Sequence, residues 1–194
     1  MIRTAIFGGS FNPIHNGHIR LAQQILQQGW VDELWLMVSP QNPLKQQQGL
    51  LDEQIRLDLA RQAVADVPGV EACDFEFHLE RPSFTWKTLA ALKKAYPDRE
   101  FSLVIGGDNW EIFPRWAHYE EILSNYPLII YPRDGYEVRL EDLPVTAHLV
   151  EAPLFPWSST QIREALRNGD EVGEMLPAAI IPILQKEKYY EVRD

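Results

Sequence analysis

Residues 8–18 contain the densest group of residues in the chain that could bind a charged ligand. They read Gly-Gly-Ser-Phe-Asn-Pro-Ile-His-Asn-Gly-His. His15 and His18 are three residues apart, a spacing that places both side chains on one side of a first helical turn. Gly8 and Gly9 allow the backbone to approach a ligand closely. A helix that begins here would add unpaired N–H groups and a partial positive charge. The segment therefore predicts a cradle for a polyphosphate.

Two other interpretations fit the histidines taken alone. One is a tight turn between a strand and a helix that carries two surface histidines. The other is a zinc site, which is disfavoured because no third cluster of ligands stands out and Cys73 is isolated. Both common phosphate fingerprints, G-x-x-x-x-G-K-[ST] and G-x-G-x-x-G, are absent here, so neither a P-loop ATPase nor a dehydrogenase is supported.

A second group of polar residues lies near the C-terminus, in the run Trp157-Ser158-Ser159-Thr160-Gln161-Ile162-Arg163. Serine and threonine are favoured at helix N-caps, and capping alone would explain Ser158, Ser159 and Thr160. It does not explain Arg163, a permanent cation that could bind phosphate.

The two segments resemble the H-x-G-H and I-S-S-T-x-[IL]-R motifs of the nucleotidyltransferase superfamily, with Trp157 in place of the isoleucine. Three further segments resemble, within that superfamily, the bacterial nicotinate-nucleotide adenylyltransferases. These are residues 105–108 with the later Trp116, residues 80–89, and residues 43–45. The chain departs from that family's usual pattern at Asn12, where aspartate is common, at Leu44, where histidine is common, and at Asp134, where proline is common.

The resemblance implies transfer of an adenylyl group from ATP to nicotinate mononucleotide, giving nicotinate adenine dinucleotide and pyrophosphate in NAD biosynthesis. The phosphate of the acceptor is already an anion and no Ser–His or Cys–His pairing is evident, so we expect direct attack without a covalent enzyme intermediate. The residues expected to bind ATP are Gly8, Gly9, Ser10, Phe11, His15, His18, Gly106, Asp108, Ser158, Ser159, Thr160 and Arg163. Of these, His15, His18 and Arg163 are expected to act in catalysis.

The mononucleotide is expected to contact Lys45, Thr85, Trp86, Trp116 and Arg133. In this interpretation Trp116 stacks on the pyridine ring, and backbone amides near Thr85 and Trp86 bind its carboxylate, with Thr85 as the N-cap of the helix it begins. Mg²⁺ is expected to arrive mainly on the phosphates of ATP, without a metal site made of protein ligands.

Rival functions come from the same superfamily and from outside it. A pantetheine-phosphate adenylyltransferase usually has T-x-G-H, so His15 speaks against it. A nicotinamide-mononucleotide adenylyltransferase differs by a single hydrogen-bonding pattern and stays open. A non-catalytic nucleotide-binding module is disfavoured by the presence of both histidines, Asp108 and Arg163.

The elements that must position these residues alternate along the chain. Short apolar runs predict buried parallel strands at 4–7, 33–38, 101–105 and 128–131. Helical periodicity predicts helices at 17–28, 52–67, 85–95, 119–124, 160–167 and 178–187, with Asp52 as an N-cap and Gly169 as a C-terminal stop. Residues 41–50 are expected to form a mobile loop. This order predicts one α/β domain over residues 1–194 with a doubly wound, mostly parallel, Rossmann-like sheet, whose ligands bind beyond the carboxyl ends of the strands.

Composition limits the partners of the chain. It has 194 residues, of which 45% are hydrophobic and 24% charged, and a net charge of -10. This balance argues against a nucleic-acid partner, which requires clustered lysine and arginine. The single cysteine and the absence of a long apolar run lead us to expect a cytoplasmic protein without a membrane partner. A homo-oligomer is compatible with the sequence.

Overall fold

The computed structural model describes residues 1–40 and 49–191, and its strands and helices alternate along the chain. Lys45, Leu44 and most of the loop expected at 41–50 lie outside the described residues. The strands are β1 (Ile2–Gly9), β2 (Glu33–Val38), β3 (Val70–Cys73), β4 (Arg99–Gly106), β5 (Leu128–Tyr131) and β6 (Ala147–Leu149). The helices are α1 (Asn16–Gln27), α2 (Glu53–Val64), α3 (Thr85–Ala95), α4 (Gly107–Ile112), α5 (Tyr119–Asn125), α6 (Ser159–Asn168) and α7 (Ile181–Glu187).

All strand pairs are parallel, and the strand order is β3-β2-β1-β4-β5-β6. The chain leaves β1 toward β2 and β3, then crosses back to place β4 on the other side of β1. The order of strands therefore reverses between β1 and β4, and this is where ligands bind in open α/β sheets. The doubly wound fold predicted from the sequence is confirmed.

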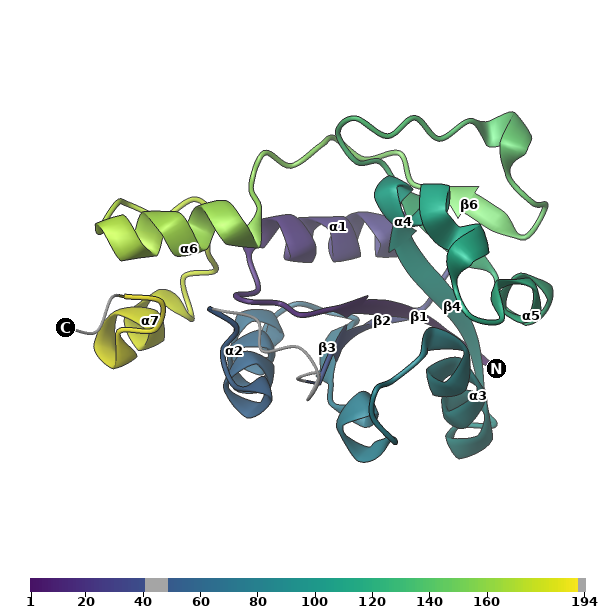
Figure 1. Cartoon of the computed structure of the whole chain (residues 1–194), viewed down its shortest axis with the longest axis horizontal. Coiled ribbons are helices and arrows are strands. Elements are labelled where there is room, and N and C mark those ends of the chain that lie inside the picture. The colour runs from purple at the N-terminus through teal and green to yellow at the C-terminus, as the bar shows by residue number, and fades with distance from the viewer. Residues whose placement is uncertain (41–48, 192–194) are drawn as a thin grey trace.

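Side chains alternate between the two faces of the sheet and build a separate core on each. Ala5 and Phe7 of β1 face a core completed by α1, α2, α6 and α7. Ile6 faces the opposite core, to which α3, α5 and the fully buried Phe113 contribute. Figure 1 shows α1 and α3 on opposite sides of the central strands. The two cores fix both β1 and β4, whose carboxyl ends carry the loops described below.

The sequence predictions hold for the long elements and for the short elements β5, α5 and α7, but they miss three other short elements. Asp52 caps α2 by accepting a hydrogen bond from the N–H of Gln54 (2.9 Å), and Gly169 ends α6 with φ 73°. Strands β3 and β6 and helix α4 were not predicted. Across residues 1–40 and 49–191, no helix combines the length and the apolar character needed to cross a membrane.

Candidate functional site

The two histidines lie at the start of α1, directly beyond the carboxyl end of β1. Their rings stack with centroids 3.7 Å apart. The N–H of Gly17 donates to Nδ1 of His15 (3.1 Å), and the N–H of His15 donates to Nδ1 of His18 (3.1 Å). A Cβ atom at position 17 would lie 2.9 Å from the His15 ring, so only glycine allows this packing. The expected placement of both rings on one side of the first turn is thus found.

These hydrogen bonds fix the tautomer of each imidazole. Because Nδ1 accepts a backbone N–H in both rings, a neutral ring carries its proton on Nε2. Burial, with a smaller contribution from the charge of Arg133, lowers the pKa of His15 to about 4. Burial likewise holds the pKa of His18 well below its usual value, with added effects of His15 and Arg133. At neutral pH the pair therefore offers two Nε2–H donors.

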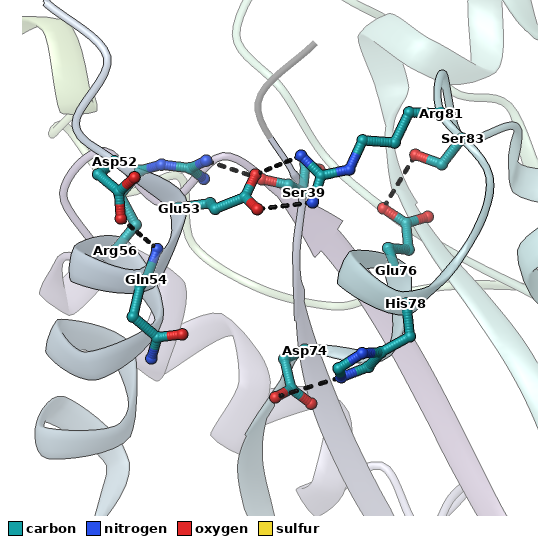
Figure 2. A network of polar contacts seen from close by, with 10 residues as sticks. All are labelled: Ser39, Asp52, Glu53, Gln54, Arg56, Asp74, Glu76, His78, Arg81 and Ser83. Carbon is teal, nitrogen blue, oxygen red and sulfur yellow. Dashed lines mark hydrogen bonds and ion pairs between the residues drawn. The ribbon is translucent and has the colours of Figure 1, made fainter. Parts of the chain in front are cut away.

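A buried arginine binds the backbone of the loop that follows β1. Arg56 is 1% exposed and donates to three backbone oxygens: those of Ser10 (2.6 Å), Ser39 (2.8 Å) and Leu51 (2.9 Å). Desolvation lowers its pKa, although Glu53 and other nearby groups oppose the change. Figure 2 shows the guanidinium of Arg56 bound to Ser39. The ends of β1 and β2 and the start of α2 are therefore tied to one cation.

Asn12 also connects this loop to distant segments. Its Nδ2 donates to the carbonyl of Gly49 (2.8 Å), while its Oδ1 accepts from the N–H of Leu51 (3.2 Å) and from the hydroxyl of Tyr190 (2.6 Å). The asparagine amide supplies both the donor and the acceptors that these contacts need. An ionised aspartate at position 12 could not donate to Gly49.

The second sequence motif meets the first one in space. Ser158 caps α6 by accepting from the N–H of Gln161 (3.2 Å), as capping preferences predict. Ser159 donates from Oγ to the carbonyl of Pro13 (3.1 Å). Arg163 donates to the carbonyl of Asn12 (2.8 Å) and to Oγ1 of Thr160 (3.2 Å). The start of α6 is thus joined to the loop between β1 and α1.

A cavity of about 440 Å³ lies between these two motifs. It is lined by residues 7–11, His15, Gly17, His18, Leu21, Asn109, 131–134, 152–155 and 157–160. Nine of the residues predicted to bind ATP line it: Gly8, Gly9, Ser10, Phe11, His15, His18, Ser158, Ser159 and Thr160. Arg163 does not line this cavity, but it donates a hydrogen bond to Thr160, which does line it.

Asp108 and Arg133 lie beside each other at the beginning of α4 and after β5. The Nε of Arg133 is 3.5 Å from Oδ1 of Asp108. This carboxylate oxygen is buried and has no hydrogen-bond partner within the described residues, and Asp108 does not line the cavity between the two motifs. Arg133 lines the larger cavity with the histidines, whereas its predicted role was to bind the mononucleotide.

A second cavity of about 240 Å³ opens between the carboxyl ends of β1 and β4 and the start of α3. Thr85 and Trp116 line it, and so does Gly106, which was predicted on the ATP side. Trp116 also packs against Phe113, with ring centroids 5.2 Å apart. Trp86 does not line it, and its ring lies 4.1 Å from that of His118.

The start of α3 differs from the prediction in one respect. Thr85 is the first helical residue rather than the N-cap; that position is occupied by Phe84, which makes no capping hydrogen bond through its side chain. The prediction was wrong because threonine is favoured at caps, yet the backbone here already turns into the helix at Thr85. The first N–H groups of α3 consequently lack a side-chain acceptor at the cap position.

The two cavities share a wall made of five residues: Phe7, Gly8, Gly9, Asn109 and Tyr131. A Cβ at Gly8 would meet no protein atom within 4 Å, so this glycine faces open space. Groups held in the two cavities would therefore meet above the end of β1.

Sequence reasoning missed several residues of this site, among them Arg56, Glu76, Asn109 and Tyr131. Arg56 has a detectable signal, because an arginine within the apolar positions of a helix is unusual. Asn109 directly follows Asp108, which was recognised. Glu76 lies in an irregular segment, and Tyr131 ends an apolar strand, so no spacing singles out either residue.

Comparison with known proteins supports the same interpretation as the geometry. Residues 6–165 match the model of the cytidylyltransferase-like family. A probable nicotinate-nucleotide adenylyltransferase from Bacteroides fragilis is 46% identical over 95% of this chain and 92% of its own length. One from Porphyromonas gingivalis is 41% identical over 90% of this chain and 89% of its own length. Nicotinic acid mononucleotide adenylyltransferase from Plasmodium falciparum, solved with NaAD, has the same fold, with a TM-score of 0.82, 20% identity and 98% coverage of both chains.

Proposed function

Because the chain belongs to the cytidylyltransferase-like family, and within it to the nicotinate-nucleotide adenylyltransferases, we propose that its paired cavities transfer an adenylyl group from ATP to nicotinate mononucleotide. The reaction forms a bond between the phosphate of the mononucleotide and the α-phosphorus of ATP, and pyrophosphate leaves. The observation that supports this proposal is the shared wall, because ligands held in the two cavities would meet over Gly8.

The larger cavity holds ATP in this proposal. The Nε2–H groups of His15 and His18 donate to the triphosphate and stabilise the charge that develops on the transferring phosphoryl group. Arg163 fixes the start of α6, whose free N–H groups face the outer phosphates. The carboxylate of Asp108 is proposed to accept a hydrogen bond from a ribose hydroxyl.

The smaller cavity holds nicotinate mononucleotide. Trp116 stacks on the pyridine ring, and the N–H groups at the start of α3 bind the ring carboxylate. Arg133 reaches the phosphate from the wall of the larger cavity, and Lys45 is proposed for the same phosphate. Catalysis then rests on positioning and electrostatic stabilisation, since the acceptor phosphate is already a nucleophile.

Mg²⁺ is proposed to accompany ATP. It would neutralise charge on the phosphate oxygens and keep several of its waters, so it needs few protein ligands. Among residues 1–40 and 49–191, no cluster of three His, Cys, Asp or Glu side chains is arranged to hold a metal ion. Because ATP is available in the cytoplasm, we place the reaction there.

The test is a pyrophosphate-release assay with ATP and Mg²⁺ against nicotinate mononucleotide, nicotinamide mononucleotide and phosphopantetheine. A carboxylate accepts from two N–H donors, whereas a carboxamide turns its NH₂ group toward one of them. The resulting unpaired groups cost about 1–3 kcal/mol each, so nicotinate should be preferred by roughly 10²-fold in kcat/KM. Comparable values for the two mononucleotides would favour the nicotinamide enzyme, and no turnover with any acceptor would refute the proposal.

A further inference from the structure

The smaller cavity carries a negative charge, although the ring carboxylate proposed to bind there is also negative and would call for a positive one. Apolar and neutral polar residues make up most of its wall. Among the described residues that line it, Glu76 is the one charged side chain. A cavity that received only the anionic carboxylate of nicotinate would gain nothing from a second carboxylate, because like charges repel.

The carboxylate of Glu76 is held by hydroxyl groups and not by a cation. Thr88 donates from Oγ1 to its Oε1 (2.7 Å), and Ser83 donates from Oγ to its Oε2 (3.4 Å). Within the described part of the chain, Glu76 forms no ion pair. Figure 2 shows its carboxylate directed toward Ser83, whereas the guanidinium of Arg81 is directed toward Glu53. Desolvation raises the pKa of Glu76, so its charge lacks compensation in the protein alone.

The chemistry of the acceptor supplies the missing cation. In an oxidised pyridine mononucleotide the ring nitrogen bonded to ribose is quaternary, so the ring carries a full positive charge. We propose that Glu76 is a specificity-determining residue that recognises this pyridinium charge in the smaller cavity. The inference rests on the proposed function, because it takes nicotinate mononucleotide as the ligand of this cavity.

Three features of the cavity would then match the three parts of a zwitterionic ring. The uncapped N-terminus of α3, beginning at Thr85, faces the ring carboxylate. Glu76 faces the ring nitrogen. Trp116 offers an aromatic face, which attracts a cationic ring more strongly than a neutral one. Thr88 connects the two polar features, since it belongs to α3 and donates to Glu76.

The test varies the charge of the ring while it keeps the rest of the ligand constant. Nicotinate mononucleotide and its 1,4-dihydropyridine form have the same carboxylate, ribose and phosphate, but the reduced ring is neutral. Dissociation constants are measured by titration calorimetry without ATP. The wild-type protein should bind the oxidised form at least about tenfold more tightly. In Glu76→Gln, which keeps an oxygen that can accept from Thr88, this preference should fall by at least about fivefold, and any remaining preference should come from Trp116.

Two comparisons act as controls. Glu71→Gln removes the same charge from an exposed position on β3 and should leave the preference unchanged. Nicotinamide mononucleotide also contains a pyridinium, so Glu76→Gln should weaken its binding by the same factor as for nicotinate. A loss confined to nicotinate would overturn the inference, because Glu76 would then act through the carboxylate site.

The wild-type protein alone can overturn the inference if Glu76→Gln fails to fold. Equal affinity for the oxidised and reduced rings would overturn the inference. If dinucleotide synthesis from ATP and nicotinate mononucleotide proceeds normally at the same time, only the role of Glu76 falls. If no dinucleotide forms at all, the proposed function itself fails.

Discussion

Replacing His18 should separate two functions that its imidazole performs with its two nitrogen atoms. Nδ1 accepts the N–H of His15, and Nε2–H faces the cavity proposed for ATP. In His18→Ala, the loss of the donor should lower kcat by a factor on the order of 10²–10³. The unpaired N–H of the buried His15 should cost about 1–3 kcal/mol of stability, which lowers Tm by roughly 2–12 °C in a chain of this size.

Two conservative variants test this division of labour. In His18→Asn, the Oδ1 of asparagine occupies about the same place as Nδ1 of histidine and can replace it as the acceptor. Tm should therefore recover while kcat stays low. In His18→Gln the amide nitrogen reaches the place of Nε2, so part of kcat should return. Turnover by pyrophosphate release and Tm by circular dichroism measure both effects. Recovery of kcat in His18→Asn would refute the reasoning, because the cap alone would then explain the loss.

Three further perturbations have defined outcomes. Arg163→Ala should raise KM for ATP. Arg163→Lys should restore only part of the affinity, because lysine lacks the planar guanidinium that binds both the Asn12 carbonyl and Thr160. Unchanged ATP kinetics in both variants would contradict this prediction. Gly8→Ala should keep Tm but raise KM for ATP by at least roughly tenfold, because the added methyl group enters open space in the cavity. The control is Gly173→Ala, whose methyl group also meets no protein atom and which should change neither Tm nor KM. The depressed pKa of His15, about 4 in the folded protein against an ordinary value of 6.5, means that the unfolded chain binds more protons between these pH values. The free energy of unfolding should therefore be at its full value above pH 6.5 and fall by up to roughly 3 kcal/mol as the pH drops to 4, and a flat profile in urea titrations would contradict it.

The elements that were predicted correctly show their pattern within their own short stretch of sequence. Residues 34–38 and 128–131 are uninterrupted apolar runs, and the strands at 33–38 and 128–131 have the predicted bounds. By contrast, β3 and β6 are short strands at the two edges of the sheet, and their sequences lack a long apolar run. They are strands because β2 and β5 offer them backbone partners, which is a tertiary effect that periodicity cannot reveal.

The site was predictable where two short motifs carried it. His15 and His18 follow from their spacing, and the meeting of residues 157–163 with the loop after β1 follows from the resemblance rather than from local pattern. The partner of each polar group was not predictable. That Asn12 would bind Gly49, Leu51 and Tyr190 depends on segments up to 178 residues away.

The buried guanidinium of Arg56 affects how the loop after β1 presents its peptide dipoles. A trans peptide unit points its C=O and its N–H in opposite directions. Since the carbonyl of Ser10 is drawn toward Arg56, the N–H of Phe11 in the same unit points away from it. The negative ends of the loop's dipoles are thereby sequestered, and a positive end remains for an anion. A chain with a net charge of -10 can in this way attract a polyphosphate without a basic surface that would also bind nucleic acids indiscriminately.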